Sequence, residues 1–338
     1  MLYVVVDGFF GDTGKGKVIS YLSLADDADL VVRGGVGPNA GHTVVFNGRT
    51  FKLRQVPSGF VNKRARLLIG PGVLVNPVVF FKEVEETGTR NRVYMDYQTG
   101  IIEKKHIEED RKSSHLSKKI GTTGSGSGPA MRDRVMRILK LAKDFDELKD
   151  FLTDVPLEVN TALDTNKKVI LEGTQGTFLS LYHGTYPYVT SKDVTASAIC
   201  SDVGVGPKRV DEVILVFKSY VTRVGGGPLK NEYTREEAEK LGVLEIATVT
   251  GRIRRAAPFN FNYAKRAVML NSPTQIALTK IDVLFKEDYG KTEWDELSPE
   301  ARKFISRIED ELNIPVTIIS TGPDVKQTID RRRELGFI

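Results

Sequence analysis

A glycine-rich loop between an apolar strand and a helix constrains the fold of this chain more than any other feature of its sequence. Residues 2–7 form a short, apolar, β-branched run, which is typical of a strand buried on both faces. Residues 11–17 (GDTGKGK) follow, and residues 17–24 then space their apolar side chains as a helix does. A strand, a glycine loop and a helix in this order predict an anion-binding site at the helix N-terminus.

The loop departs from a Walker phosphate loop at one position. That motif ends in a hydroxyl that holds magnesium, whereas this chain has Val18 there. Valine cannot bind a metal, so another hard oxygen must replace the hydroxyl, and Asp12 is the only carboxylate in the loop. A carboxylate among phosphates would otherwise repel them, so Asp12 is a candidate for metal ligation, proton transfer or both. The alternative is a plain glycine-rich turn.

Composition narrows the classes of protein to consider. The 338 residues, 40% of them hydrophobic and 28% charged, suit a globular protein with one large α/β domain or two smaller ones. No run of about 18 apolar residues and no basic leader is present, which favours a cytoplasmic protein without a membrane partner. One cysteine and four histidines argue against a disulfide framework and a structural zinc site. The net charge of +5 favours anionic partners of any kind.

Short β-branched runs alternate with amphipathic stretches, which predicts an α/β fold with a mainly parallel central sheet flanked by helices. The expected strands are residues 2–7, 30–33, 66–69, 92–95, 168–171, 212–219, 274–279 and 315–320. A hairpin is expected around Asn47 and Gly48, the strongest short turn signal available. Residues 103–119 and 296–311 are predicted to be charged surface helices, and residues 121–129 a flexible loop of the kind that forms lids. No repeat or long linker divides the chain, so one domain over residues 1–338 is expected.

A second glycine-rich segment, residues 33–43, follows the second expected strand. Loops after parallel strands converge on one edge of a sheet, so this segment is expected to face Asp12. It carries His42, which can donate or accept a proton near neutral pH and assist charge development on an oxygen or phosphate. A structural hydrogen bond is the alternative role for this histidine.

Two later segments indicate classes of ligand. Residues 278–282 (LTKID) resemble the [NT]-K-x-D signature of guanine-binding proteins, in which the aspartate accepts hydrogen bonds from guanine that adenine cannot donate. Residues 248–255 (TVTGRIRR) place three arginines within four residues, and arginine forks bind carboxylate or phosphate. An ordinary strand end and a basic or nucleic-acid-binding patch are the alternatives. The patch is disfavoured because no aromatics are interleaved and no nucleic-acid-binding module is recognisable.

Together these segments resemble the adenylosuccinate synthetase family, from Gly8 to Asp324. The resemblance rests on GDTGKGK, NAGHT, GTTGSGSGPA, LEGTQGTFLSLYHGTYPYVTS, TRVGGGP, TVTGRIRR, LTKIDVL and STGPD, in family order. It implies a P-loop-like GTP-binding architecture and the ligation of L-aspartate to IMP in purine synthesis, with GTP consumed and Mg²⁺ required. Asp12 matches the base that removes the N1 proton of IMP, so that O6 attacks the γ-phosphate. His42 matches the acid that stabilises the transferring group, and the amine of aspartate then displaces phosphate.

The resemblance also assigns ligand contacts to matching positions. GTP would contact Gly11, Asp12, Thr13, Gly14, Lys15, Gly16, Lys17, Gly41, His42, Thr43, Arg254, Lys280, Ile281, Asp282, Ser320, Thr321 and Gly322. IMP would contact Asp12, Thr13, Gly14, Lys15, Asn39, Ala40, Gly41, His42, Thr123, Arg137, Gln175, Thr190 and Arg252. Aspartate would contact Thr248, Val249, Thr250, Gly251, Arg252, Ile253 and Arg254. One Mg²⁺ per subunit would bind Asp12 and the Gly41 carbonyl, and Arg137, expected in the helix after the serine-glycine loop, would reach IMP in the other subunit of a homodimer.

The chain departs from the family pattern at several places, of which Thr13 and the chain length concern the site and the size of the protein. Thr13 stands where most members have glutamate, which leaves the contacts of that side chain open. The chain is also shorter than most members, as in archaeal short forms. The rival interpretation is a regulatory GTP-binding switch without IMP chemistry. Such a switch would need a complete Walker motif, and it has no use for the GTTGSGSGPA and TGRIRR segments.

Overall fold

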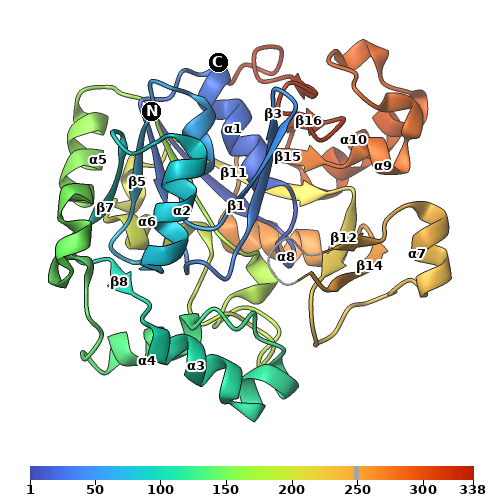
Figure 1. Cartoon of the computed structure of the whole chain (residues 1–338). Coiled ribbons are helices and arrows are strands. Elements are labelled where there is room, and N and C mark those ends of the chain that lie inside the picture. The colour runs from blue at the N-terminus through green and yellow to red at the C-terminus, as the bar shows by residue number, and fades with distance from the viewer. Residues whose placement is uncertain (247–250) are drawn as a thin grey trace.

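A ten-stranded sheet forms the centre of the computed structural model, which describes residues 1–246 and 251–338 (Figure 1). From one edge to the other the strands are β17 (Thr328–Asp330), β16 (Val316–Ser320), β15 (Gln275–Thr279), β11 (Glu212–Lys218), β1 (Leu2–Asp7), β10 (Val169–Glu172), β2 (Leu30–Arg33), β5 (Arg66–Ile69), β7 (Val93–Asp96) and β9 (Leu152–Thr153). Neighbouring strands of this sheet pair in parallel, except β16 with β17. The predicted α/β fold with a mainly parallel sheet is confirmed.

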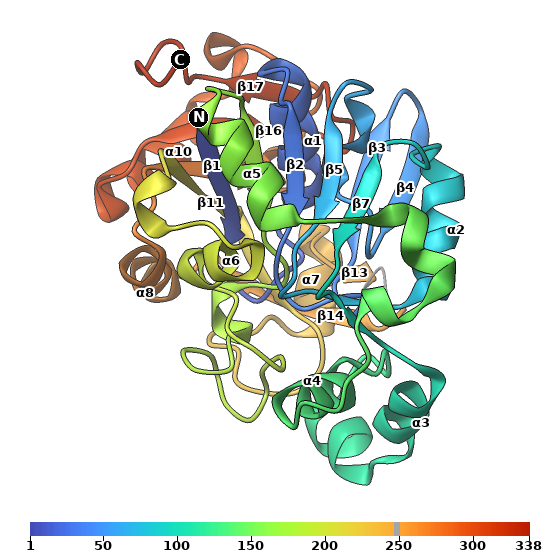
Figure 2. The same cartoon turned by 90° about the vertical axis from the view of Figure 1, so that its left-hand side faces the viewer.

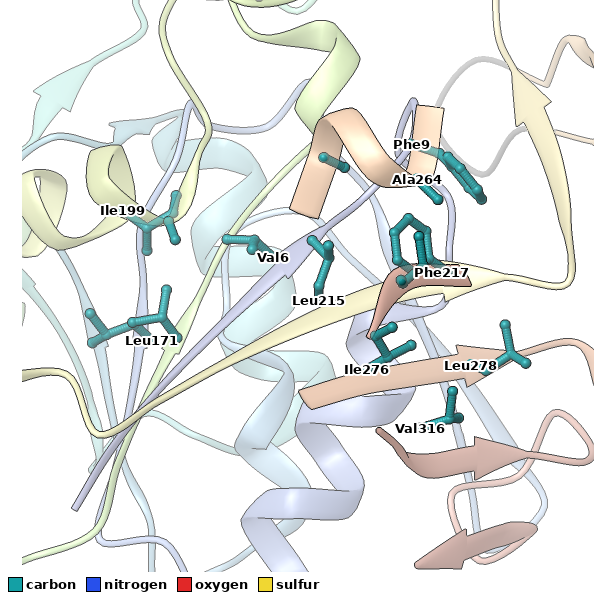
Figure 3. Close-up of a cluster of buried hydrophobic side chains, with 14 of the residues drawn as sticks. Val6, Phe9, Leu171, Ile199, Leu215, Phe217, Ala264, Ile276, Leu278 and Val316 are labelled. Carbon is teal, nitrogen blue, oxygen red and sulfur yellow. The ribbon is translucent and has the colours of Figure 1, made fainter. Parts of the chain in front are cut away.

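Helices cover both faces of the sheet (Figure 2). Helices α1 (Lys15–Ala25) and α2 (Pro77–Thr87) pack on one face, and α5 (Val155–Asp164), α6 (Ala196–Val203), α8 (Phe261–Asn271) and α10 (Pro299–Leu312) pack on the other. Strand β1 contributes alternate side chains to the two cores, since Val6 packs on the α6 side and Val5 on the α1 side. Figure 3 shows the α6 side, where Val6 lies near Ile199 and Leu215. Burial on both faces explains the unbroken apolar runs of the sequence.

Smaller elements surround the main sheet. The predicted hairpin is present as β3 (His42–Phe46) and β4 (Arg49–Leu53), with Asn47 and Gly48 both at positive φ in the turn. A second group comprises β12 (Tyr220–Arg223), β14 (Ile253–Pro258), β13 (Glu245–Ile246) and the short helices α7 (Arg235–Leu241) and α9 (Ile281–Leu284), and β6 (Leu74–Val75) pairs with β8 (Gly100–Ile101). Within the described ranges, no helix is both long and apolar enough to cross a bilayer.

The segment around the predicted lid differs from the expectation. The helix expected over residues 103–119 is split into α3 (Lys104–Lys112) and a π-helical turn (His115–Ile120), because Ser113 has extended backbone angles. The loop expected over residues 121–129 is shorter, since α4 (Ser127–Val135) begins within it. Pro129 lies in the first turn of α4, where a missing N–H removes no helical hydrogen bond.

Candidate active site

A cavity of about 730 Å³ lies where the loops after the parallel strands meet. The predicted contacts that line it are Gly11, Asp12, Thr13, Gly14, Lys15, Gly16, Lys17, Asn39, Ala40, Gly41, His42, Thr43, Thr123, Gln175, Thr190, Arg252, Arg254, Lys280, Ser320 and Gly322. Within the described ranges, Arg137, Gly251, Ile253, Ile281, Asp282 and Thr321 do not line it. Thr248, Val249 and Thr250 lie outside the described residues. The segments predicted to converge therefore do so.

The N-terminus of α1 brings the two glycine-rich segments together. Gly14 caps the helix with a left-handed backbone, φ 85°. An added Cβ at Gly16 would lie 2.9 Å from the Cβ of His42, so only glycine permits this approach of helix to hairpin. Val18 is buried in the core. The helix N-terminus, Asp12 and His42 thus share one cavity, and Val18 takes no part in it.

Asp12 lies at the wall of this cavity. Its side chain is 25% exposed, and its Oδ2 lies 3.0 Å from Nε of Arg254. Burial raises the pKa of Asp12 above its usual range, while the charges of Arg254 and Lys218 oppose that shift. A carboxylate with a raised pKa is better matched to accepting a proton near neutral pH than an ordinary aspartate.

His42 belongs to a buried network centred on Glu172, the last residue of β10. Glu172 Oε1 accepts hydrogen bonds from Nδ1 of His42 at 2.5 Å, from Nη1 of Arg33 at 2.9 Å and from the Ser58 hydroxyl at 2.8 Å. Burial and the charge of Arg33 lower the pKa of His42 to about 4. Burial opposes the shift of Glu172, but His42 and Arg33 lower the pKa of Glu172 to about 2. The imidazole is therefore neutral at pH 7 and donates its Nδ1 proton to Glu172.

This arrangement leaves the other ring nitrogen of His42 available. Nε2 of His42 is buried, and no residue of the described ranges bonds to it. Buried polar atoms are normally hydrogen-bonded, so such an atom marks a place for a ligand. Glu172 was not among the residues predicted from the sequence, although a charged residue at the end of a buried apolar run was a visible signal for it.

Lys17 lines the cavity, and its ammonium bonds to the loop after β16. Its Nζ donates to the hydroxyl of Ser320 at 2.7 Å and to the carbonyls of Gly322 and Gln327, each at 2.6 Å. Burial lowers its pKa to about 7. Lys17 thus ties α1 to the loop after β16. Lys15, in contrast, bonds to Asp7 and to the carbonyl of Gln175.

The predicted guanine motif lies at the end of β15. Asp282 is in the first turn of α9, and its Oδ1 is buried without a partner among the described residues. Burial raises the pKa of Asp282, against the effect of Lys280. A bound donor would satisfy this oxygen. Ile281 instead packs in the core, and the Thr321 hydroxyl bonds to the Lys291 carbonyl, so neither side chain faces the cavity.

The arginines of the TGRIRR segment divide into two groups. Arg252 donates to the Gly121 carbonyl at 2.9 Å and so joins this segment to the loop before α4. Arg254 ion-pairs with Glu245, which also accepts from Lys218 at 3.0 Å. Arg255 turns away to pair with Glu232. Two of the three guanidinium groups therefore lie at the cavity, and so does Glu245, which was not among the predicted site residues.

Several of the predicted IMP contacts are polar residues that line the cavity, whereas Arg137 lies away from it. Asn39 Nδ2 donates to the hydroxyl of Thr190 at 3.1 Å, while Asn39 Oδ1 and Gln175 Nε2 are buried without partners among the described residues. Thr123 exchanges a hydrogen bond with Ser125 at 2.9 Å. Arg137 was expected within a helix but lies beyond the end of α4, where its backbone is left-handed with φ 63°. It is exposed on the outside of this chain.

Acid should weaken the fold through the His42 pair. As the pH falls from about 6.5 towards 4, an unfolded histidine takes up a proton that folded His42 does not, so the free energy of unfolding falls. Between pH 7 and 5 we expect a loss of about 1–2 kcal/mol from this group. Urea unfolding of the wild type and of His42→Gln at both pH values measures it as the difference between the two losses. The exposed His183→Gln is the control, and a His42→Gln loss equal to that of the wild type would contradict the expectation.

Comparison with known proteins agrees with this geometry. The family model for adenylosuccinate synthetase matches residues 4–145 and 138–289. The adenylosuccinate synthetase of Archaeoglobus fulgidus is 58% identical over 98% of each chain, and that of Methanocaldococcus jannaschii is 57% identical over 98% of this chain and 97% of its own. The solved, fully ligated adenylosuccinate synthetase of Plasmodium falciparum superimposes with a TM-score of 0.89 at 26% identity, covering 97% of this chain and 99% of that one. The chain therefore belongs to the adenylosuccinate synthetase family.

Proposed function

We propose that this chain ligates L-aspartate to IMP at the expense of GTP, giving adenylosuccinate, GDP and phosphate for the synthesis of AMP. The observation that carries the proposal is the meeting of Asp12, His42 and the glycine loop in one cavity, beside a guanine motif with an unpartnered carboxylate oxygen. Membership of the family supports the same activity. The residue roles given below extend the proposal to individual side chains.

The first step converts O6 of IMP, which is a poor leaving group, into a phosphate ester, which is a good one. Asp12 takes the N1 proton of IMP, the electron pair shifts to O6, and O6 attacks the γ-phosphorus of GTP, which breaks the bond to GDP. The raised pKa of Asp12 suits this base, because a carboxylate of ordinary pKa would bind the proton too weakly. In the second step the amine of aspartate attacks C6, the C6–O6 bond breaks to release phosphate, and the new secondary amine gives up one proton to solvent.

His42 serves the phosphoryl transfer in this proposal. With Nδ1 bonded to Glu172, Nε2 is the ring nitrogen that is left to bond to a phosphate. Phosphate charge beside the ring raises the pKa of a histidine, so the neutral imidazole is expected to take up a proton when the nucleotides bind. The Nε2–H then donates to the transferring group, where negative charge develops.

We infer that the loop around Asp12 would bind one magnesium ion. Within the described ranges, no three histidine, cysteine or acidic side chains form a complete metal cage. Magnesium commonly binds one or two carboxylates and completes its shell with waters and substrate phosphates, and Asp12 with the Gly41 carbonyl would provide the protein ligands. Bound there, Mg²⁺ would neutralise charge on the phosphates of GTP. Asp12 lines the cavity, so its carboxylate is available there both as the base and as a magnesium ligand.

The extent and location of the enzyme are also part of the proposal. Residues from Phe10 to Pro323 line the cavity, which supports treating residues 1–338 as one catalytic domain. Cys200 is a buried free thiol, as suits the reducing cytoplasm in which we place the protein. Arg252 and Arg254 line the cavity, where they can bind the carboxylates of aspartate, whereas the predicted contacts Gly251 and Ile253 do not line it.

Omitting substrates one at a time tests the reaction. We expect phosphate release from GTP to require IMP and aspartate together, because the reactive intermediate is protected only in the complete complex. Phosphate release and product absorbance should be followed with each substrate left out in turn. Asp12→Asn should bind nucleotides without turnover, since an amide neither takes the proton nor binds magnesium well. Equal GTP hydrolysis with IMP or aspartate absent would instead indicate a GTP-binding switch.

Guanine selection should depend on Asp282. In Asp282→Asn one acceptor oxygen becomes a donor, so the KM for GTP should rise about 10- to 100-fold, the effect of a lost hydrogen bond to a charged group. The KM values for IMP and aspartate should change by less than about twofold. Steady-state rates with GTP, ITP and ATP give the comparison. An unchanged preference for GTP would refute the guanine assignment.

The dimer with shared sites is tested by mixing inactive variants. Arg137 is exposed beside Val135, Met136 and Ile138, an apolar surface that suits contact with a second copy. Arg137→Gln and Asp12→Asn should each lack activity alone. Subunits mixed and allowed to exchange should recover roughly a quarter of wild-type activity, because half of the dimers are mixed and each has one intact site. No recovery in mixtures that form mixed dimers would contradict the sharing of Arg137.

A further inference from the structure

We propose that Asp7 is a positioning residue for the reaction: its buried carboxylate is the internal anion around which the loop of residues 9–15 is wound. The loop thereby holds Asp12 at the cavity before any phosphate binds. The inference rests on the proposed ligase function, because its effect is on the placement of the base and of Lys15.

The four donors to Asp7 come from alternate residues. Its Oδ1 accepts the backbone N–H groups of Phe9 at 2.7 Å and Gly11 at 3.3 Å. Its Oδ2 accepts from the hydroxyl of Thr13 at 2.5 Å and from Nζ of Lys15 at 3.1 Å. Each oxygen therefore receives two donors, and the chain from residue 9 to residue 15 is fixed at every second position.

Asp12 lies between two of these fixed positions. Its backbone is left-handed with φ 58°, a conformation that is uncommon for residues other than glycine, although aspartate adopts it more readily than most. The bonds from Gly11 and Thr13 to Asp7 hold the flanking residues and so keep Asp12 in this conformation. The carboxylate of Asp12 then stands at the cavity wall beside Arg254. Asp7 thus acts on the reaction through Asp12 and does not touch substrate.

Burial explains why a full charge is needed at position 7. The side chain of Asp7 is 0% exposed and that of Lys15 3% exposed. A buried ammonium requires a counter-charge, and the only other acceptor of Lys15 in the described ranges is the Gln175 carbonyl, at 2.6 Å. In an ordinary phosphate loop the bound phosphate provides that charge and orders the backbone amides. In this chain the carboxylate of Asp7 provides the counter-charge of Lys15 and also orders the backbone N–H groups of the loop.

The surroundings of Asp7 leave no room for a longer acid. An added Cβ at Gly176 would lie 2.4 Å from Asp7 Oδ1 and 2.3 Å from the Gly11 nitrogen, so β1, the loop and the segment after β10 are in close contact. The same geometry accounts for Thr13 in place of the glutamate expected from the family pattern. A second carboxylate at position 13 would face Asp7 and repel it, whereas a hydroxyl donates to it.

Asp7→Asn tests the inference, because an amide keeps the shape of the side chain and removes its charge. The amide oxygen can still accept from Phe9 and Gly11, but the amide nitrogen cannot accept from Thr13 or Lys15. We expect kcat to fall about 10- to 100-fold, as for loss of a charge-assisted hydrogen bond. The KM for aspartate should stay within about twofold of wild type, because Arg252 and Arg254 keep their places.

Asp26→Asn is the matched control. Asp26 is a buried acid at the opposite end of α1, where it bonds to Nη1 of Arg332 at 2.6 Å and Nη2 at 3.0 Å. This variant should lower the Tm at least as much as Asp7→Asn while kcat stays at the wild-type value. Equal kcat in wild type and Asp7→Asn, or an equal loss in Asp7→Asn and Asp26→Asn, would overturn the positioning role.

Thr13→Val tests the positioning role of Asp7 if Asp7→Asn does not fold. It removes one donor to Asp7 at nearly constant volume, so kcat should fall several-fold with the KM for aspartate unchanged, and an unchanged kcat would overturn the inference. The result that would refute the proposed function differs from the result that would refute the role of Asp7. A wild-type protein that forms no ligation product refutes the ligase, whereas an active wild type with equally active Asp7→Asn refutes only the role of Asp7.

Discussion

Buried charge at the carboxyl edge of the sheet is the constraint on which the site depends. Strands β1, β2, β10 and β11 end in Asp7, Arg33, Glu172 and Lys218, each almost completely buried. Ions in such places are tolerated only when partners of opposite charge bond to them. Each of these residues therefore recruits a partner from another segment, and these pairings bring the loops of the cavity together.

The pairings also set what the candidate catalytic groups can do. Glu172 serves a permanent cation, Arg33, and the imidazole of His42 at once, so the imidazole remains neutral until another anion arrives. Arg254 stands between Asp12 and Glu245 in the same way. A cation shared by two carboxylates can exchange one of them for a substrate anion and remain bound by the other. The cavity is thus arranged to respond to incoming phosphate and carboxylate.

Much of the fold could be predicted from local patterns. The bounds of β1, β2 and β5 agree with the apolar runs, and Asn47-Gly48 located the hairpin, because these signals depend on neighbours in sequence. Asp12 and His42 were found because they stand within glycine-rich loops. Glu172 stands at the end of an apolar run, but its partner His42 lies 130 positions away in the sequence, so the sequence alone does not show what Glu172 binds. The break at Ser113 has no strong local signal, which explains the overlong helix expected there.

Lys17 gives the nucleotide site a fixed length. Its ammonium fastens the first turn of α1 to the loop that follows β16, and α1 begins at the glycine loop proposed to hold the phosphates. The other end of that span is the loop with Ser320 and Gly322, which are predicted contacts of GTP. The start of α1 and the loop after β16 would therefore bind different parts of the nucleotide while Lys17 keeps these two segments at a fixed distance. Because the distance between these two segments is fixed, the position of the bound base would determine the position of the terminal phosphate.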